Sequence, residues 1–280
     1  HSDVYSFKNF SIRPTLNIRS ISSILLIVLL GFLNFSANSQ RAVVLNMPNY
    51  DNEPLHFGFV LGVNVSHATV RPIADLSTRV FDSTFLPDIL PMPDSARVLA
   101  ITSTPIPGFV VSIVANLQVG KRFELQFVPS LSFGDRTLNY DIETYQFRPG
   151  NPEPINQLTI IKKIPSTFVN FPLEIKYKAA RYNNFRPYLM TGVQYSLDLA
   201  SNAKKREQKN RNEKIVKFNQ NDIYIQAGVG FDFFNEWFKL GIELKMMYGV
   251  FDVLKRENNI YTESLEKVNS KIFQLSFTFQ

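Results

Sequence analysis

The side chains best suited to catalysis are scarce in this chain of 280 residues. It has no cysteine, and its three histidines are His1, His56 and His67, which excludes thiolate chemistry and leaves little for a histidine-based metal site. Ser66 precedes His67, and Asp75 lies eight residues beyond it; these are the residue types of a serine hydrolase. Because adjacent residues of a strand point to opposite faces, we expect no catalytic pair here. We therefore expect no enzymatic activity, no metal and no cofactor.

A larger set of polar residues is defined by its spacing. Nine charged residues stand at positions that alternate with large apolar ones: Glu124, Glu174, Lys176, Arg186, Asp222, Asp232, Lys239, Glu243 and Lys245. Charges removed from water must be paired and hydrogen-bonded, and acids and bases are nearly equal in number in this set. The pattern favours a structural network of ion pairs, and a relay for protons or substrates is the alternative.

The elements that position these residues are expected to be strands, because apolar residues recur with a period of two. Eight segments show this pattern: 55–65, 108–117, 123–133, 168–178, 186–197, 222–233, 238–249 and 271–280. Each is about 9–12 residues long, which is the length of a tilted strand that crosses a bilayer. Beyond residue 40 there is no run of 18 apolar residues, so any insertion into a membrane must use strands.

The connections between these segments fall into two classes. Short ones follow the second, fourth and sixth segments, at Gln118–Arg122, Ala179–Phe185 and Phe234–Trp237. Long ones follow the others, at 66–107, 134–167, 198–221 and 250–270. Such sorting is typical of an outer-membrane barrel with short periplasmic turns and long extracellular loops. The sequence thus predicts an all-β, eight-stranded, antiparallel up-and-down transmembrane barrel; a soluble β protein is the alternative.

The polar face of the strands would fill the barrel. Eight strands leave an interior only wide enough for side chains, so the nine charged residues would form a packed polar network and not a pore. We expect no small-molecule substrate, and nucleic acid is not expected as a partner of an exported barrel.

A basic run lies in the third long connection. Residues 201–217 hold seven Lys or Arg against two Glu, at Lys204, Lys205, Arg206, Lys209, Arg211, Lys214 and Lys217. Two interpretations stay open. The run is a solvated loop tip, or it attracts the anionic headgroups of lipopolysaccharide or an acidic partner, since clustered charge concentrates counter-ions.

Two other long connections contain apolar stretches, at 85–93 and 158–161. Exposed apolar stretches in water more often mark docking surfaces than solvated tips. Strands that extend beyond the membrane would bury them equally well, so both interpretations stay open.

The first residues have the composition of an export signal. Lys8, Arg13 and Arg19 precede the apolar run 24–33, and the small residues of 37–39 follow it, which is the pattern of a cleaved signal peptide. We expect a signal peptide at 1–39, a periplasmic lead-in segment at 40–54 and the barrel at 55–280. The expected location is the outer membrane of a Gram-negative cell, with its lipid and lipopolysaccharide as partners.

The lead-in segment carries a resemblance. The stretch Leu45-Asn46-Met47-Pro48-Asn49-Tyr50-Asp51 and the following Pro54–Gly62 resemble the N-terminal signature of the PorT family, outer-membrane barrels associated with the type IX protein secretion system. Chain length, strand count and loop placement agree with that family over essentially the whole mature chain.

The resemblance implies a function in protein export. It implies a role in exporting proteins across the outer membrane or in assembling the machinery that does so, with other secretion-system proteins as partners and no catalytic residues. Because eight strands cannot pass a folded cargo, the role would be that of an accessory or assembly component. The alternative is a stand-alone barrel with a structural, lipopolysaccharide-binding or ligand-binding role.

Overall fold

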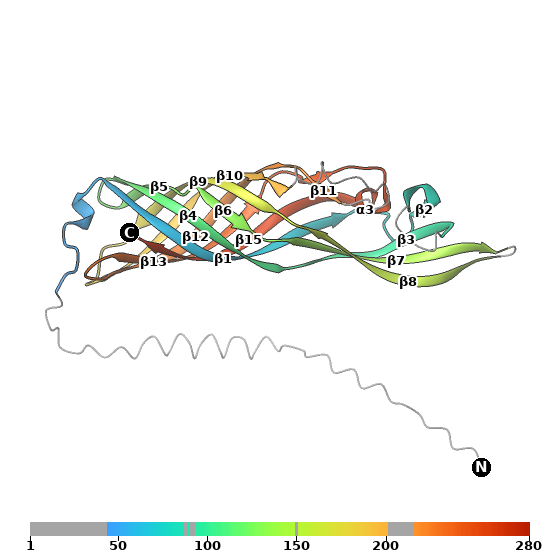
Figure 1. Cartoon of the computed structure of the whole chain (residues 1–280), viewed down its shortest axis with the longest axis horizontal. Coiled ribbons are helices and arrows are strands. Elements are labelled where there is room, and N and C mark those ends of the chain that lie inside the picture. The colour runs from blue at the N-terminus through green and yellow to red at the C-terminus, as the bar shows by residue number, and fades with distance from the viewer. Residues whose placement is uncertain (1–43, 87–88, 90–92, 149–150, 201–215) are drawn as a thin grey trace, which may run out of the picture. The chain divides into compact units, whose positions relative to one another are not determined.

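The computed structural model describes the chain except for residues 1–43, 87–88, 90–92, 149–150 and 201–215 (Figure 1). The expected signal peptide and residues 40–43 of the expected lead-in therefore lie outside the described residues, and so do Lys204, Lys205, Arg206, Lys209, Arg211 and Lys214 of the basic run. Residues Leu45–Gln280 form one unit by their internal contacts.

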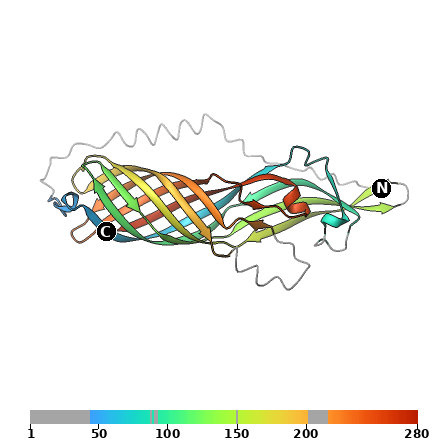
Figure 2. The same cartoon turned by 90° about the horizontal axis from the view of Figure 1, so that it is seen from above.

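The central element is a closed ring of antiparallel strands (Figures 1 and 2). It contains β1 (Leu55–Pro72), β4 (Ile106–Val119), β5 (Phe123–Phe127) with β6 (Ser130–Phe133), β9 (Thr167–Lys178), β10 (Phe185–Asp198), β12 (Asn221–Phe234), β13 (Lys239–Gly249) and β15 (Leu265–Phe279). Strands β5 and β6 share one position, so the ring has eight strands. It closes because β1 pairs with both β15 and β4. The predicted eight-stranded all-β barrel is confirmed.

The alternation of the sequence explains which way each strand faces. Large apolar side chains at the odd positions of β1, such as Phe57, Phe59 and Val63, are exposed on the outside of the ring, and Val60 between them is buried inside. Aromatic pairs stack across neighbouring strands near both ends, with ring centroids 4.9 Å apart for Phe59–Phe279 and 4.6 Å apart for Phe109–Phe133. An apolar outer band bounded by aromatic residues is typical of barrels that face lipid.

Helices are few and short in the described part of the chain. They are η1 (Tyr50–Asn52), η2 (Ser83–Phe85) and α3 (Ile260–Glu263). The side chain of Asn259 caps α3 by accepting a hydrogen bond from the backbone N–H of Thr262. Among the described residues, none of the helices has the length and apolar character needed to cross a membrane.

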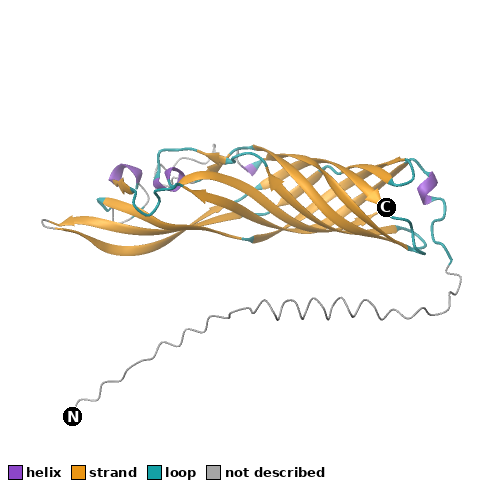
Figure 3. Ribbon diagram, turned by 180° about the vertical axis from the view of Figure 1, so that it is seen from behind, coloured by secondary structure: helices purple, strands orange, loops and turns teal. Residues whose placement is uncertain are grey.

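The expected long loops at 66–107 and 134–167 are largely strands, which corrects the prediction. A second antiparallel sheet has the order β2 (Val80–Asp82), β3 (Ser95–Thr104), β7 (Arg136–Arg148) and β8 (Asn151–Ile164). It lies beyond the end of the barrel opposite the short turns (Figure 3). Only Pro105 separates β3 from β4, so this sheet continues strands of the ring. A smaller pair joins β11 (Lys217–Phe218) to β14 (Leu254–Lys255).

This outer sheet has its own hydrophobic core. Leu138, Tyr140 and Ile142 of β7 are fully buried and pack in one cluster with residues of β15, α3 and β14, among them Leu265 and Ile260. The period-two pattern that predicts the ring also occurs in β3 and β7. The apolar residues of that pattern form this core, which is the physical reason why these segments are strands and not loops.

The core also decides between the two interpretations of the apolar stretches for the residues that the structure describes. Leu86 and Ile89 are buried in this cluster, and Leu158 and Ile160 pack against it. The cluster outside the ring therefore buries the described residues Leu86 and Ile89 of the first stretch and contacts Leu158 and Ile160 of the second, whereas Ile161 remains 58% exposed.

We predict that Ile142→Ala loosens the outer sheet and leaves the barrel folded. Removing a fully buried isoleucine side chain costs about 2–5 kcal/mol, and this cost falls on the cluster outside the ring. Limited proteolysis of the purified protein should cut faster between β3 and β8, while the barrel keeps its folded migration on an unheated gel. The exposed Ile161→Ala is the control, and equal cleavage of the two variants would contradict the assignment.

Candidate functional site

The candidate site is the interior of the barrel. The nine charged residues predicted to form a network lie inside the ring, and each is 0–4% exposed. The strands bring them together because every second side chain points inward. The pairing of neighbouring strands then places inward residues opposite each other, as for Glu124 with Lys176 and Gly230 with Glu243. Most of them form two clusters, one in the middle of the barrel and one toward the short turns.

The middle cluster is centred on two carboxylates. Glu243 accepts from Lys176 Nζ at 2.7 Å and from the Tyr188 hydroxyl at 2.9 Å, and Lys245 Nζ lies 3.0 Å from its second oxygen. Lys245 also donates to Glu174 at 2.9 Å. Each charge thus meets an opposite charge within hydrogen-bond distance, which is what burial demands.

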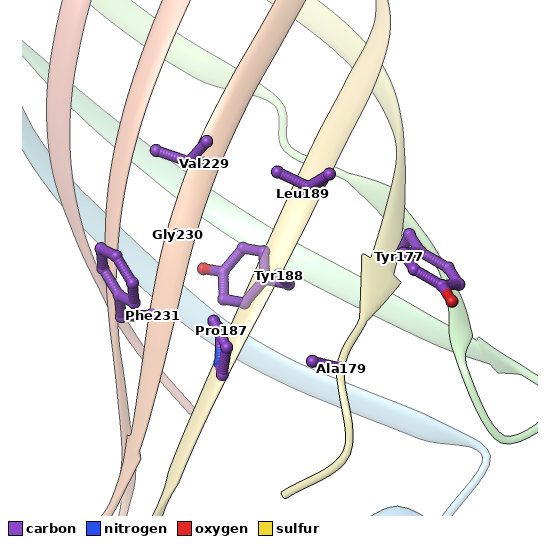
Figure 4. Close-up of a pocket in the computed structure, with 8 residues that line it drawn as sticks. All are labelled: Tyr177, Ala179, Pro187, Tyr188, Leu189, Val229, Gly230 and Phe231. Carbon is purple, nitrogen blue, oxygen red and sulfur yellow. The ribbon is translucent and has the colours of Figure 1, made fainter.

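Tyr188 reaches this cluster because Gly230 on the neighbouring strand has no side chain. A Cβ at Gly230 would overlap the end of the Tyr188 ring, so any other residue there would displace the tyrosine from this position. On the outside of the ring the same place is an apolar hollow of about 410 Å³, lined by residues such as Leu189, Val229 and Phe231 (Figure 4). Apart from the tyrosines Tyr177 and Tyr188, its lining residues are apolar or glycine.

A second cluster lies toward the short turns. Lys178 Nζ is 3.1 Å from Glu124, and Arg186 and Lys239 approach the two oxygens of Asp232 at 3.5 and 3.9 Å. The sequence pattern contained a signal for Lys178, which follows Lys176 at the next inward position of β9, but the predicted network omitted it.

Asp51 of the lead-in segment completes this second cluster. Arg186 Nη1 donates to its two oxygens at 2.7 and 2.9 Å, and Lys178 Nζ lies 3.7 Å away. With Asp51 the two clusters hold five acids and five bases: Asp51, Glu124, Glu174, Asp232, Glu243, Lys176, Lys178, Arg186, Lys239 and Lys245. The lead-in therefore neutralises the last of the five cations.

The electrostatics of Asp51 favour its charged form. Burial by itself raises the pKa of this carboxyl, but the hydrogen bond and charge of Arg186, together with the charges of Lys178 and Arg181, more than offset that effect. The pKa of Asp51 is therefore lower than usual.

Tyr50 of the lead-in covers the end of the barrel interior. Only 5% of it is exposed. Its ring stacks on His56 at a centroid distance of 3.8 Å, and Lys239 Nζ lies 4.6 Å from the ring centre. Its hydroxyl donates to Gln280 Oε1 at 3.2 Å. No periodicity marks Tyr50 or Asp51, since neither lies on a strand.

The short turn Ala179–Asn184 contacts two further described residues of the lead-in, Asn46 and Met47. The guanidinium of Arg181 lies 3.7 Å from the ring centre of Phe234 and donates to the carbonyls of Met47 and Asn46. Asn46 in turn donates from its side chain to the carbonyl of Phe234 at 3.0 Å. The segment is thus fixed by side-chain contacts to the short-turn end of the ring.

The opposite end of the interior is filled by Arg136. It is 2% exposed, its guanidinium lies 4.8 Å from the ring centre of Phe168 and 5.1 Å from that of Phe218, and it donates to Ser270 at 2.9 Å. Asp222 is also buried, but in the described residues no ion pair joins it to either cluster. The structure thus brings eight of the nine predicted residues together, and Asp222 stands apart.

The other candidate residues are dispersed. Ser66 is buried inside the ring while His67, one residue on, lies on the outward face. Within the described ranges no group of three or more His, Cys, Asp or Glu could hold a metal ion. Of the seven basic-run residues only Lys217 is described; it begins β11 and pairs with Lys255.

Comparison with known proteins decides the family. A model described as "Outer membrane protein beta-barrel domain" matches residues 37–255. The chain belongs to this family. This outer-membrane barrel therefore presents its apolar outer face to lipid.

Two solved structures are similar to the outer-membrane barrel. Neisserial surface protein A (NspA) is 11% identical, with a TM-score of 0.34 over 81% of this chain and 98% of that one. The outer membrane protein OprG from Pseudomonas aeruginosa is 13% identical, with a TM-score of 0.33 over 79% and 92%. No curated protein matches the sequence. At these values the likeness carries no argument about function.

We predict that Glu243→Gln strongly destabilises the outer-membrane barrel. The substitution removes the ion pair of Lys176 with Glu243 and one of the two ion pairs of Lys245. Breaking a buried ion pair costs about 3–5 kcal/mol. Urea titration of the detergent-solubilised protein measures the free energy of unfolding. Glu266→Gln, which breaks the exposed pair with Arg71, is the control and should cost below about 1 kcal/mol. Similar losses in both variants would contradict the buried network.

We predict that docking of the lead-in depends on pH through Asp51. Because its pKa is lowered by docking, the stabilisation is full above the ordinary value of about 3.9 and is lost as pH falls through the lowered value. A spin label at Asn49→Cys, the only cysteine in the chain, reports the mobility of the segment. Asp51→Asn should make the label mobile at neutral pH, whereas Glu53→Gln should not. A label equally immobile in Asp51→Asn would show that other contacts hold the segment.

Proposed function

We propose that this outer-membrane barrel is a non-enzymatic accessory or assembly component of type IX protein secretion. The observation that carries the proposal is the lead-in segment, which resembles the PorT family in sequence and docks at the short-turn end of the ring. The proposal assigns the chain no conduit and no catalytic step.

The filled interior supports an accessory role. Charged side chains occupy the middle of the barrel, Tyr50 covers one end and Arg136 fills the other. A folded cargo needs a wide channel, and the ring of eight strands leaves room only for side chains. Any partner in secretion would therefore use the surfaces at the two ends of the barrel.

The lead-in offers one such surface on the periplasmic side. In its motif Asn46, Tyr50 and Asp51 face the barrel, whereas Pro48 and Asn49 between them are exposed. The docked residues hold the exposed ones in a fixed conformation, so a partner would meet an ordered segment and lose less conformational entropy on binding. Other secretion-system proteins are the partners that we propose for it.

The outer sheet offers a second surface. Its hydrophobic core makes it a rigid platform outside the membrane. A rigid platform suits the docking of another subunit better than mobile loops do, for the same entropic reason.

We predict that a clean deletion in the native host blocks type IX secretion. Proteins that carry the sorting domain of that pathway should disappear from the cell surface and accumulate in the periplasm, and quantitative proteomics of the two fractions measures this. The parent gene supplied in trans should restore secretion. Under the proposal a double variant of the exposed lead-in residues, Pro48→Ala with Asn49→Ala, should impair secretion while the barrel still folds.

The deletion also separates the two candidate functions. If secretion is unchanged, the accessory role is wrong. The chain would then be a stand-alone barrel with a structural, lipopolysaccharide-binding or ligand-binding role.

A further inference from the structure

The outward face of the ring carries charge on one strand pair only. At outward positions of the strands as described, residues of the types Lys, Arg, His, Asp and Glu occur solely on β1 and β15: His67, Arg71, Lys267 and Lys271. Every other outward position of the ring is uncharged. We name these four residues the outer basic patch.

The patch begins where the apolar band ends. Lys271 is paired in register with His67 on one side and with Tyr248 on the other. Its Nζ lies 5.1 Å from the ring centre of Phe273, the outward aromatic residue of β15 nearest the outer sheet. A lysine whose ammonium group lies over an aromatic ring at the edge of the lipid-facing band is placed at the level of the lipid headgroups. Since this end of the ring bears the outer sheet, the headgroups are those of the outer leaflet.

The patch has two levels. Lys267 is paired in register with Arg71 and lies four residues from Lys271, about 13 Å along the strand. Glu266 lies outside the patch but forms an exposed ion pair with Arg71 at 3.0 Å. The three cations Arg71, Lys267 and Lys271 together with this carboxylate have a net charge of +2. Two cationic levels suit a headgroup that bears separated anionic groups.

We propose that the outer basic patch binds the phosphorylated headgroup of an outer-leaflet glycolipid. The apolar band directly below it, with Phe273, Leu275 and Val65 exposed, receives the acyl chains of the same molecule. A ligand with an anionic head and an apolar tail satisfies both surfaces at once, whereas an acidic protein or a free anion would use the cations alone. This site is separate from the basic run and does not depend on the role in secretion.

The test uses the full-length protein in detergent and measures its binding of two ligands. One is fluorescent lipopolysaccharide, and the other is the same lipopolysaccharide after removal of its phosphates. The parent should prefer the phosphorylated form. Lys267→Ala with Lys271→Ala should weaken its binding by about tenfold or more, since a cation near an anionic lipid surface contributes about 1 kcal/mol. The corresponding double Lys→Arg variant should retain binding, and added salt should weaken it.

The matched control removes two exposed lysines elsewhere, Lys121→Ala with Lys163→Ala, and should bind like the parent. Folded migration on an unheated gel establishes that each variant is an intact barrel. The proposal is overturned if the parent binds both lipopolysaccharide forms equally, or if the two double alanine variants bind alike.

Discussion

The rest of the structure depends on the pairing of charges buried inside a narrow ring. Lysine and glutamate side chains on facing strands cannot reach water, so each must find its partner across the interior. Glu243 is the clearest case, because it joins lysines from β9 and β13 to the tyrosine of β10. These contacts fill the space that a channel would need. The same constraint favours docking of the lead-in, since Asp51 gives Arg186 and Lys178 a second carboxylate beside Asp232 and Glu124.

The sequence predicts the ring well because strand alternation is a local property. It does not separate the ring from the outer sheet, since Pro105 and the pair Pro165–Ser166 read as strand ends although the strands resume beyond them. The charged network is readable from the inward positions of each strand, including the omitted Lys178. Tyr50 and Asp51 are not readable in this way, because neither lies on a strand and, apart from the stacking of Tyr50 on His56, the contacts described for them come from residues more than a hundred positions away along the chain.

Family and fold explain what the molecule is, but its two water-facing ends distinguish it from a generic barrel. The apolar band could serve any barrel of this size. The features that go beyond the ring are the lead-in motif at one end and the outer sheet with its own core at the other. Function is therefore to be sought in what these ends contact, and this is where the resemblance to a secretion component lies.

The packing site of Tyr50 has a consequence for the order of folding. It is built from His56 at the start of β1, Phe234 at the end of β12, Lys239 at the start of β13 and Gln280 after β15. These parts meet only once the last strand has joined the first. The lead-in can therefore dock only on a completed barrel, and its docked state distinguishes a finished molecule from an intermediate still being inserted.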